Sequence, residues 1–275
     1  MTVKRKWLMA GGLFLLVLIG LLGWVVGGQG TPFGLYFGRD STWHAMEKRS
    51  VWRVGVDPSF PPFEWLDETT GKPIGFDVAL AGRLAETWDM QVEIVPIGFD
   101  SLLDALRANK IDSVLSAYPY DPRLTRDFAF SQPYFDAGLQ LAVRPGSPIH
   151  APADLGGKRV AVEWGSAGDM VGRRLQREGI DVALAPFETP DLALNALFVD
   201  NSIDALLVDN VTLRQAQASG RPVVAIGEPL ESVPYVVVMP TRARELQQRV
   251  HDGLVHLTES GALRTLEETW FARRD

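Results

Sequence analysis

The spacing of hydrophobic residues changes in a regular order from Val51 onward. Short apolar runs, typical of buried strands, alternate with stretches whose apolar residues recur every three or four positions, typical of helices. The runs predict strands over 52–56, 92–96, 111–115, 159–162, 181–185, 204–208, 223–226 and 235–239. The helical spacing predicts helices over 77–88, 100–108, 169–177, 191–199, 242–258 and 262–271.

This alternation is typical of α/β proteins, in which mostly parallel open sheets are covered by helices. It restarts after Arg144, so the sequence predicts two such lobes. Ligands of open sheets bind beyond the carboxyl ends of the strands. Asp57 and Asp209 each follow directly on a predicted strand, and we therefore expect both carboxylates near a ligand site.

The N-terminal segment has a different pattern. Residues 7–26 are uncharged and apolar, a length that spans a bilayer as a helix, and Lys4, Arg5 and Lys6 precede them. Because a basic flank stays cytoplasmic, this run predicts a membrane anchor with residues 31–275 outside the membrane. A signal peptide that is cleaved after the run is the alternative.

Composition narrows the functional classes. The 275 residues are 46% hydrophobic and 22% charged, as in globular proteins, and the net charge is −7. An acidic chain is a poor partner for nucleic acid. The chain has no cysteine, which excludes disulfides and thiolate chemistry, and its four histidines are scattered. We therefore expect no metal site and no cofactor.

The stretch VGVDPSFPPFEW, from Val54 to Trp65, holds the first candidate site residues. An acid and aromatics follow a strand, and the proline pair fixes φ and stiffens the loop. Such a loop suits recognition of a small molecule. We expect Phe63 and Trp65 in the core, whereas for Asp57 and Phe60 ligand contact and a structural role both remain open.

Several spaced motifs now indicate a family. The stretch above, GKPIGFDVALA (Gly71–Ala81), FDSLLDAL (Phe99–Leu106), FSQPYF (Phe130–Phe135) and EETWF (Glu267–Phe271) resemble the amino-acid-type (family 3) extracellular solute-binding proteins of bacterial ABC transporters. The resemblance implies a two-lobe, periplasmic-binding-protein-like clamshell after the anchor. The implied organisation is a basic flank and anchor (1–28), a tether (29–50), lobe 1 (51–138 and 233–275) and lobe 2 (139–232).

The resemblance also implies ligand contacts. Asp57 matches the acid that contacts the side chain or amine, and Phe60 and Phe99 match the stacking aromatics. Ser166 matches the hydroxyl residue near the ligand carboxylate, and Asp209 matches the acid that pairs with the ammonium. A buried ammonium needs such a partner, and aromatic faces favour cations.

One part of the family pattern is absent. The stretch from Ala117 to Pro119 replaces the usual glycine and hydroxyl residues, and Pro119 has no N–H to donate. Leu124 occupies the position of the arginine that binds the ligand carboxylate, so Arg123 is the candidate to replace it. Glu163 adds another acid, either in the cleft or toward solvent. Together these residues favour a polar or cationic amino acid, with an amine lacking the α-carboxylate as an alternative.

The implied function is capture of this ligand outside the membrane for an ABC permease, by a monomer without catalysis. Two alternatives stay open: a sensing module for a separate signalling partner, and an enzyme resembling the dehydratases on this fold, with Glu163 as general acid. The segment Trp164–Gly168 lacks the first glycine of a G-x-S-x-G nucleophile motif.

Overall fold

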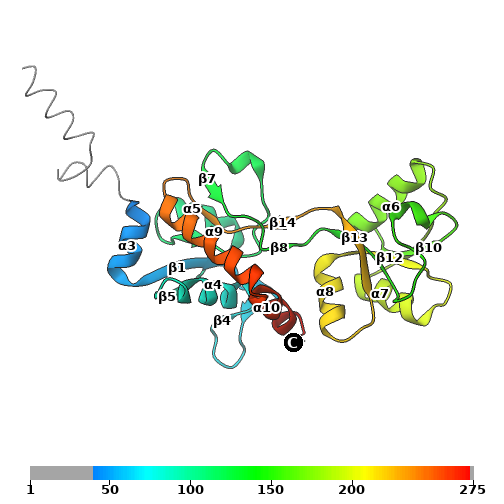
Figure 1. Cartoon of the computed structure of the whole chain (residues 1–275), viewed down its shortest axis with the longest axis horizontal. Coiled ribbons are helices and arrows are strands. Elements are labelled where there is room, and N and C mark those ends of the chain that lie inside the picture. The colour runs from blue at the N-terminus through cyan, green and yellow to red at the C-terminus, as the bar shows by residue number, and fades with distance from the viewer. Residues whose placement is uncertain (1–39, 273–275) are drawn as a thin grey trace, which may run out of the picture.

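The computed structural model describes residues 40–272 and shows an elongated molecule of two lobes joined by two crossing segments of chain (Figure 1). Each lobe is built around a five-stranded sheet, which confirms the predicted two-lobed α/β fold. The anchor predicted over 7–26 lies outside the described residues. Within 40–272, no helix is both long enough and apolar enough to cross a membrane.

The first lobe is built on a sheet with strand order β5–β1–β6–β15–β7. Its strands are β1 (Val51–Val56), β5 (Gln91–Pro96), β6 (Ser113–Val114), β7 (Phe128–Phe130) and β15 (Val238–Pro240). β1 is parallel to β5 and β6, whereas β15 is antiparallel to β6 and β7. A small antiparallel sheet lies beside them, formed by β2 (Ser59–Phe60), β3 (Glu64–Leu66) and β4 (Pro73–Ile74).

Helices cover both faces of this sheet. They are α3 (Ser41–Arg49), α4 (Phe76–Glu86), α5 (Leu102–Arg107), α9 (Arg244–Glu259), α10 (Ala262–Phe271) and the short η1 (Phe99–Ser101) and η2 (Pro122–Leu124). α4, α9 and α10 share a core with Trp52, Val54 and Val56 of β1. α5 packs with Val114 and Val238 in a separate cluster. Burial of β1 between these layers explains why Arg53 is its only polar residue.

The second lobe has the strand order β11–β10–β12–β9–β13. Its elements are β9 (Leu139–Val143), η3 (Pro152–Leu155), β10 (Arg159–Glu163), α6 (Ala167–Arg177), β11 (Ala183–Phe187), α7 (Pro190–Val199), β12 (Ala205–Asp209), α8 (Asn210–Ala218) and β13 (Val224–Glu231). Along β12, Leu206 and Val208 pack in the cluster of α7 and α8, whereas Ala205 and Leu207 pack in the cluster of α6. The strand alternation therefore places α6 on the opposite face of the sheet from α7 and α8.

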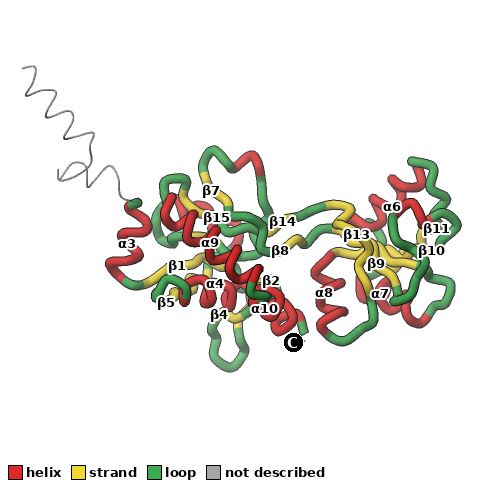
Figure 2. The backbone as a smooth tube through the Cα atoms, viewed as in Figure 1, coloured by secondary structure: helices red, strands yellow, loops and turns green. Residues whose placement is uncertain are grey.

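The two crossing segments form a small sheet of their own between the lobes. β8 (Phe135–Asp136) pairs antiparallel with β14 (Pro234–Tyr235). Figure 2 places both strands between the lobes. Asp136 Oδ1 accepts hydrogen bonds from the backbone N–H of Val233 at 2.9 Å and of Gly138 at 2.7 Å. One carboxylate thus ties the outgoing segment to the returning one.

The two segments approach each other closely at Gly138. A Cβ atom at this position would lie 1.9 Å from the carbonyl oxygen of Glu231. No side chain fits at that distance, so glycine is required for the backbones to cross side by side.

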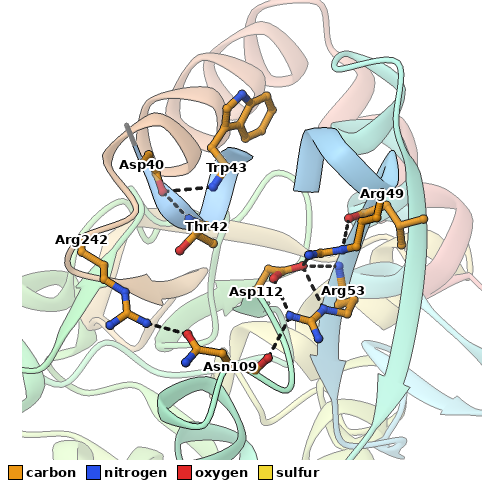
Figure 3. Close-up of polar contacts among 9 residues, drawn as sticks. Asp40, Thr42, Trp43, Arg49, Arg53, Asn109, Asp112 and Arg242 are labelled. Carbon is orange, nitrogen blue, oxygen red and sulfur yellow. Dashed lines mark hydrogen bonds and ion pairs between the residues drawn. The ribbon is translucent and has the colours of Figure 1, made fainter. Parts of the chain in front are cut away.

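The predicted tether over 29–50 is wrong in its described part, because residues 41–49 form helix α3, packed on the first lobe. Asp40 caps this helix by accepting from the N–H groups of Thr42 at 2.8 Å and Trp43 at 3.0 Å (Figure 3). Its other oxygen accepts from the N–H of Glu245 at the start of α9. Met46 is fully buried, and Trp43 packs edge-on against Trp88 with centroids 5.8 Å apart. A capped helix with two buried apolar side chains outweighs the polar composition that suggested a tether.

An ion-pair network fixes the other end of α3. Asp112, 3% exposed, pairs with Arg49 and with Arg53, whose Nη2 lies 2.9 Å from Asp112 Oδ1 (Figure 3). Asp112 Oδ2 also accepts the backbone N–H of Arg53 at 2.8 Å. The segment that enters the lobe from the N-terminal side is therefore held at both ends.

Several predicted elements differ in extent from the observed ones. The helix predicted over 100–108 starts with the 3-10 turn η1 before α5 begins at Leu102. The strand predicted over 111–115 reduces to β6. The strand predicted over 235–239 divides into β14 and β15, because the chain leaves the small sheet between the lobes at Tyr235 and joins the first lobe's sheet at Val238.

Candidate ligand-binding site

A cavity of about 350 Å³ opens on the first lobe beyond the carboxyl end of β1. The residues that line it are Asp57, Ser59, Phe60, Glu64, Phe99, Ser116, Ala117, Pro119, Val233 and Tyr235. Five of the predicted site residues are therefore neighbours here. The expectation that Asp57 lies at the ligand end of the sheet agrees with this geometry.

The two predicted stacking aromatics each lean on a more buried ring. Phe60 stacks on Phe63 with centroids 5.6 Å apart and planes 8° apart, and Phe99 stacks on Tyr118 at 5.2 Å and 14°. Phe60 stays 44% exposed and Phe99 41% exposed. Each ring is thus supported on one face and open on the other, which suits stacking against a planar or cationic group.

Hydrogen bonds connect Asp57 to the loops around it. Its carboxylate oxygen Oδ2 accepts from the backbone N–H of Phe99 at 2.8 Å, and its own N–H donates to Ser116 Oγ at 2.9 Å. The turn after β6 also pairs with the returning segment, because Tyr120 N–H donates to Pro234 O at 2.8 Å. The cavity floor is therefore braced by three separate stretches of chain.

Two acids that were not among the predicted site residues lie here, Glu64 in the cavity lining and Asp77 behind it. Glu64, 1% exposed, accepts from Ser116 Oγ at 2.7 Å. Asp77, fully buried, accepts from the backbone N–H of Ala117 at 2.5 Å and from Tyr134 Oη at 2.9 Å. The signal available in the sequence was an acid inside each of two otherwise apolar motifs, FPPFEW and GFDVALA.

The second lobe presents a smaller hollow of about 70 Å³ at the carboxyl ends of β10 and β12. Its lining residues are Leu139, Glu163, Ser166, Ala167, Gly168, Pro190, Ala193, Leu207, Val208 and Asp209. Three further predicted residues, Glu163, Ser166 and Asp209, are thus gathered on this lobe. Glu163 is partly exposed, so its carboxylate is neither sealed in the core nor fully in solvent.

Two of these three residues, Ser166 and Asp209, cap helices. Ser166 Oγ accepts from the N–H of Asp169 at 3.3 Å at the start of α6. Asp209 accepts from Thr212 N–H at 2.8 Å and from Thr212 Oγ1 at 2.7 Å at the start of α8. The caps explain why these residue types follow strands, and they place both side chains at positive ends of helix dipoles.

The two hollows are electrostatically connected. Burial raises the pKa of Tyr235, which lines the first-lobe cavity, to about 12, and the charges of Asp77 and Asp209 add to this rise. Asp209 of the second lobe therefore acts on a side chain of the first-lobe cavity.

Arg123 is not brought to the site. Its guanidinium forms a 2.6 Å ion pair with Asp121, and its side chain is 87% exposed. Asp121 raises the pKa of Arg123 accordingly. Leu124 packs beside the α5 cluster. Within residues 40–272, neither hollow is lined by a lysine or an arginine.

Comparison with known proteins identifies the family to which the chain belongs. The model of the bacterial extracellular solute-binding proteins, family 3, matches residues 52–273. An L-cystine-binding protein of Escherichia coli is 27% identical over 86% of this chain and 88% of its own length. An L-arginine-binding protein of Pseudomonas aeruginosa is 26% identical over 80% of this chain and 87% of its own.

Solved structures agree with the fold. An ancestral cationic amino acid solute-binding protein is 28% identical, with TM-score 0.61, over 84% of this chain and 100% of its own. A substrate-binding protein of a polar amino acid ABC uptake transporter from Streptococcus thermophilus is 22% identical, with TM-score 0.73, over 86% of this chain and 93% of its own. An ancestral cyclohexadienyl dehydratase is 22% identical, with TM-score 0.70, over 83% of this chain and 95% of its own; this is a likeness of fold alone.

Proposed function

Because the chain belongs to the bacterial extracellular solute-binding proteins, family 3, we propose that it captures a polar or cationic amino acid between its lobes and delivers it to an ABC permease. Relatives named for L-cystine, for L-arginine and for lysine, arginine and ornithine support an amino acid as the ligand. The apolar run over 7–26 would hold the protein at the outer face of the cell membrane, or direct its secretion if that run is cleaved.

The observation that carries the proposal is the charge of the two hollows. Asp57 of the first lobe and Glu163 and Asp209 of the second line them, and no described lysine or arginine does. Closure of acidic surfaces on each other without a cation between them is unfavourable, because like charges repel more strongly as water leaves. A ligand with an ammonium group relieves this repulsion.

The aromatic rings favour a ligand with a positively charged side chain. The open faces of Phe60 and Phe99 sit beside Asp57 in one cavity. A guanidinium or an ammonium on a flexible side chain gains both from the carboxylate and from the ring faces. The ligand side chain would therefore lie on the first lobe.

The ligand carboxylate has a weaker set of partners. Arg123 is turned to Asp121 and solvent. The N-terminus of α6, capped by Ser166, is the available donor group on the second lobe, since helix N-termini favour anions. We expect a carboxylate to contribute less affinity here than the ammonium does.

Thermal unfolding of the full-length protein in mild detergent tests the proposal. The panel contains arginine, lysine, cystine, polar amino acids, polyamines and small dicarboxylates. A ligand at 100 times its Kd stabilises the protein by about 2.7 kcal/mol, which is measurable as a higher Tm. Stabilisation by cationic or polar amino acids supports the proposal. A response to polyamines alone would assign the pocket to amines without a carboxylate, and a response to dicarboxylates alone would overturn the assignment of charge.

A further inference from the structure

Glu64 and Asp77 are two acids buried together without a basic partner. Glu64 lies on β3 and Asp77 in the first turn of α4, and the backbone N–H of Asp77 donates to the carbonyl oxygen of Phe63, the residue before Glu64, at 2.9 Å. In the described part of the chain, neither carboxyl group forms an ion pair with a lysine, arginine or histidine. Two carboxylates in contact in a dry interior cannot both stay ionised, because nothing offsets their repulsion and lost hydration.

The hydrogen bonds of the pair leave a position for one proton. Glu64 Oε1 accepts from Ser116, and Asp77 Oδ2 accepts from Ala117 and Tyr134. Glu64 Oε2 and Asp77 Oδ1 are buried and receive no hydrogen bond from any N–H or O–H donor of the described residues. A proton held between the two carboxyl groups satisfies both remaining oxygens at once.

The same pair supports the floor of the first-lobe cavity. Glu64 holds the Ser116 hydroxyl, which accepts the N–H of Asp57 at 2.9 Å, and Asp57 in turn accepts the N–H of Phe99. Asp77 holds the N–H of Ala117, whose φ of 42° lies in the left-handed region that side chains disfavour. The two acids therefore reach Ala117 through one hydrogen bond, Asp57 through two and Phe99 through three.

We propose that Glu64 and Asp77 share a single proton, and that this pair is a positioning device that sets the Asp57 and Ala117 turns for ligand binding. The shared proton follows from burial and hydrogen bonding alone, whereas its effect on affinity rests on the proposed function. Asp77 does not line the cavity, and Glu64, which does, is proposed as a support for the loops and not as a ligand contact. The two acids act through Ser116 and through the Ala117 backbone.

The titration behaviour of the surroundings agrees with one retained proton at neutral pH. Burial, and then the charge of Asp77, raises the pKa of Glu64 to about 11, with a smaller contribution from Asp57 in the loop after β1. Burial raises the pKa of Asp77 to about 6. The other titratable groups facing the pair are Tyr134, before β8, and Tyr235, on β14, and burial raises the pKa of both. All these groups are acids, so none supplies a cation that could replace the proton.

Infrared spectroscopy of the full-length protein at about pH 7.5 tests the shared proton directly. The C=O stretching band of a protonated carboxyl group is expected in the wild type and absent in Glu64→Gln, whose amide replaces the carboxyl. The difference spectrum between the two removes other protonated acids. A spectrum without this difference overturns the proposal, whether or not any ligand binds.

Affinity measurements test the positioning role. Glu64→Gln retains a donor and an acceptor and is expected to weaken ligand binding by about threefold at most, whereas Glu64→Ala weakens it by about tenfold or more. Ser116→Ala removes the link to Asp57 and leaves the pair intact, so it covers the case in which Glu64→Ala fails to fold. It is expected to weaken binding by about fivefold with the infrared band retained.

The possible failures are distinguishable. Equal affinities in wild type and Ser116→Ala would remove the positioning role and leave the shared proton. The infrared band with no binding of any amino acid or amine by the wild type would refute the proposed function and not the proton.

Discussion

The two lobes have similar sheets and helices, yet they bury different side chains. In the described residues, the first-lobe core contains a set of buried aromatic residues: Trp43, Trp52, Phe63, Phe76, Tyr134, Phe135, Tyr235 and Phe271. The second-lobe clusters bury alanine, valine, leucine and isoleucine, with Phe187 and Phe198 only partly buried at their margin. The first lobe also encloses Glu64 and Asp77, whereas the buried Asp169 of the second lobe pairs with Arg173 at 2.9 Å.

The difference indicates that the two lobes position their site residues in different ways. Phe63 contacts Phe135 and Tyr235 of the small interlobe sheet with centroids 5.1 Å and 5.3 Å apart, and Phe271 of the last helix at 5.4 Å. The Phe63 ring thus contacts both crossing segments and the C-terminal helix, and it links them to the loop that follows β1. The second lobe instead presents Ser166 and Asp209 as helix caps, whose geometry depends on local hydrogen bonds. We therefore expect site geometry to depend on core packing in the first lobe more than in the second.

The largest expected effect comes from Phe63→Ala. Loss of a fully buried aromatic ring costs about 3–5 kcal/mol of unfolding free energy, and here it should also weaken ligand binding, because Phe60 loses the ring on which it stacks. Leu197→Ala, at a fully buried position on α7, is the matched change and should cost about 2–5 kcal/mol with affinity retained. Urea unfolding and titration calorimetry measure both quantities. Equal losses of affinity in the two variants would contradict the division between the lobes.

A smaller loss is expected at the junction of the lobes. Gly138→Ala forces a Cβ atom against the Glu231 carbonyl, so the crossing segments must separate, at a cost of about 2–3 kcal/mol. Gly146→Ala, where a Cβ meets nothing within 4 Å but φ is +79°, controls for backbone strain alone. Tm values compare their stability, and small-angle scattering compares the distribution of lobe separations. An unchanged distribution in Gly138→Ala would mean that this glycine does not set the crossing.

The acids of the two lobes can be compared by removing charge alone. Asparagine keeps the side-chain oxygen that accepts from Phe99 in Asp57→Asn and from Thr212 in Asp209→Asn. Each change should weaken binding of a cationic amino acid by about ten- to a hundredfold, because an ammonium loses a charged partner. Calorimetry with arginine and with arginine amide, which lacks the carboxylate, separates the contribution of the ligand carboxylate from that of the positively charged groups. If either substitution changed the contribution of the carboxylate more than that of the positive groups, the assigned roles would be contradicted.

The acid pair makes stability depend on pH in the first lobe. The pKa of Glu64 is raised to about 11, so the folded state keeps a proton that the unfolded state releases above about pH 4.5. The contribution of this proton to the unfolding free energy is complete below about pH 4.5, declines as pH rises and is lost once pH passes about 11. Glu64→Gln has no such proton to lose. The difference in unfolding free energy between Glu64→Gln and wild type should therefore shift in favour of the variant as pH increases, by at most about 1.4 kcal/mol per pH unit. Parallel urea-unfolding profiles from neutral pH to about pH 10 would contradict the prediction.

Much of this fold follows from local pattern, whereas helix α3 and the buried acid pair depend on contacts between distant residues. The strand and helix periods depend on burial of one face or both, so β1, α4 and the second-lobe elements from β10 to β12 were predicted from spacing alone, while β9 and α8 were not predicted. Helix α3 was missed because its stabilising contacts, from Asp40 to Glu245 and from Arg49 to Asp112, join residues far apart in sequence. Glu64 and Asp77 were missed for the same reason, since a carboxyl pair is visible only after β3 and α4 pack together.

The smallest expected effect concerns Arg123. Its place next to Leu124, where the family pattern has an arginine, suggested that Arg123 binds the ligand carboxylate. Its guanidinium pairs with Asp121 in solvent, so Arg123→Ala should leave amino acid affinity within about twofold. Leu124→Arg is the matched gain: it puts a guanidinium at the position where the family's pattern has one, and it should favour arginine over its decarboxylated analogue by about tenfold. Competition binding of the two ligands measures this preference. A loss of arginine affinity in Arg123→Ala would mean that the side chain leaves Asp121 when the lobes close, and the second lobe would then not be the main source of carboxylate contacts.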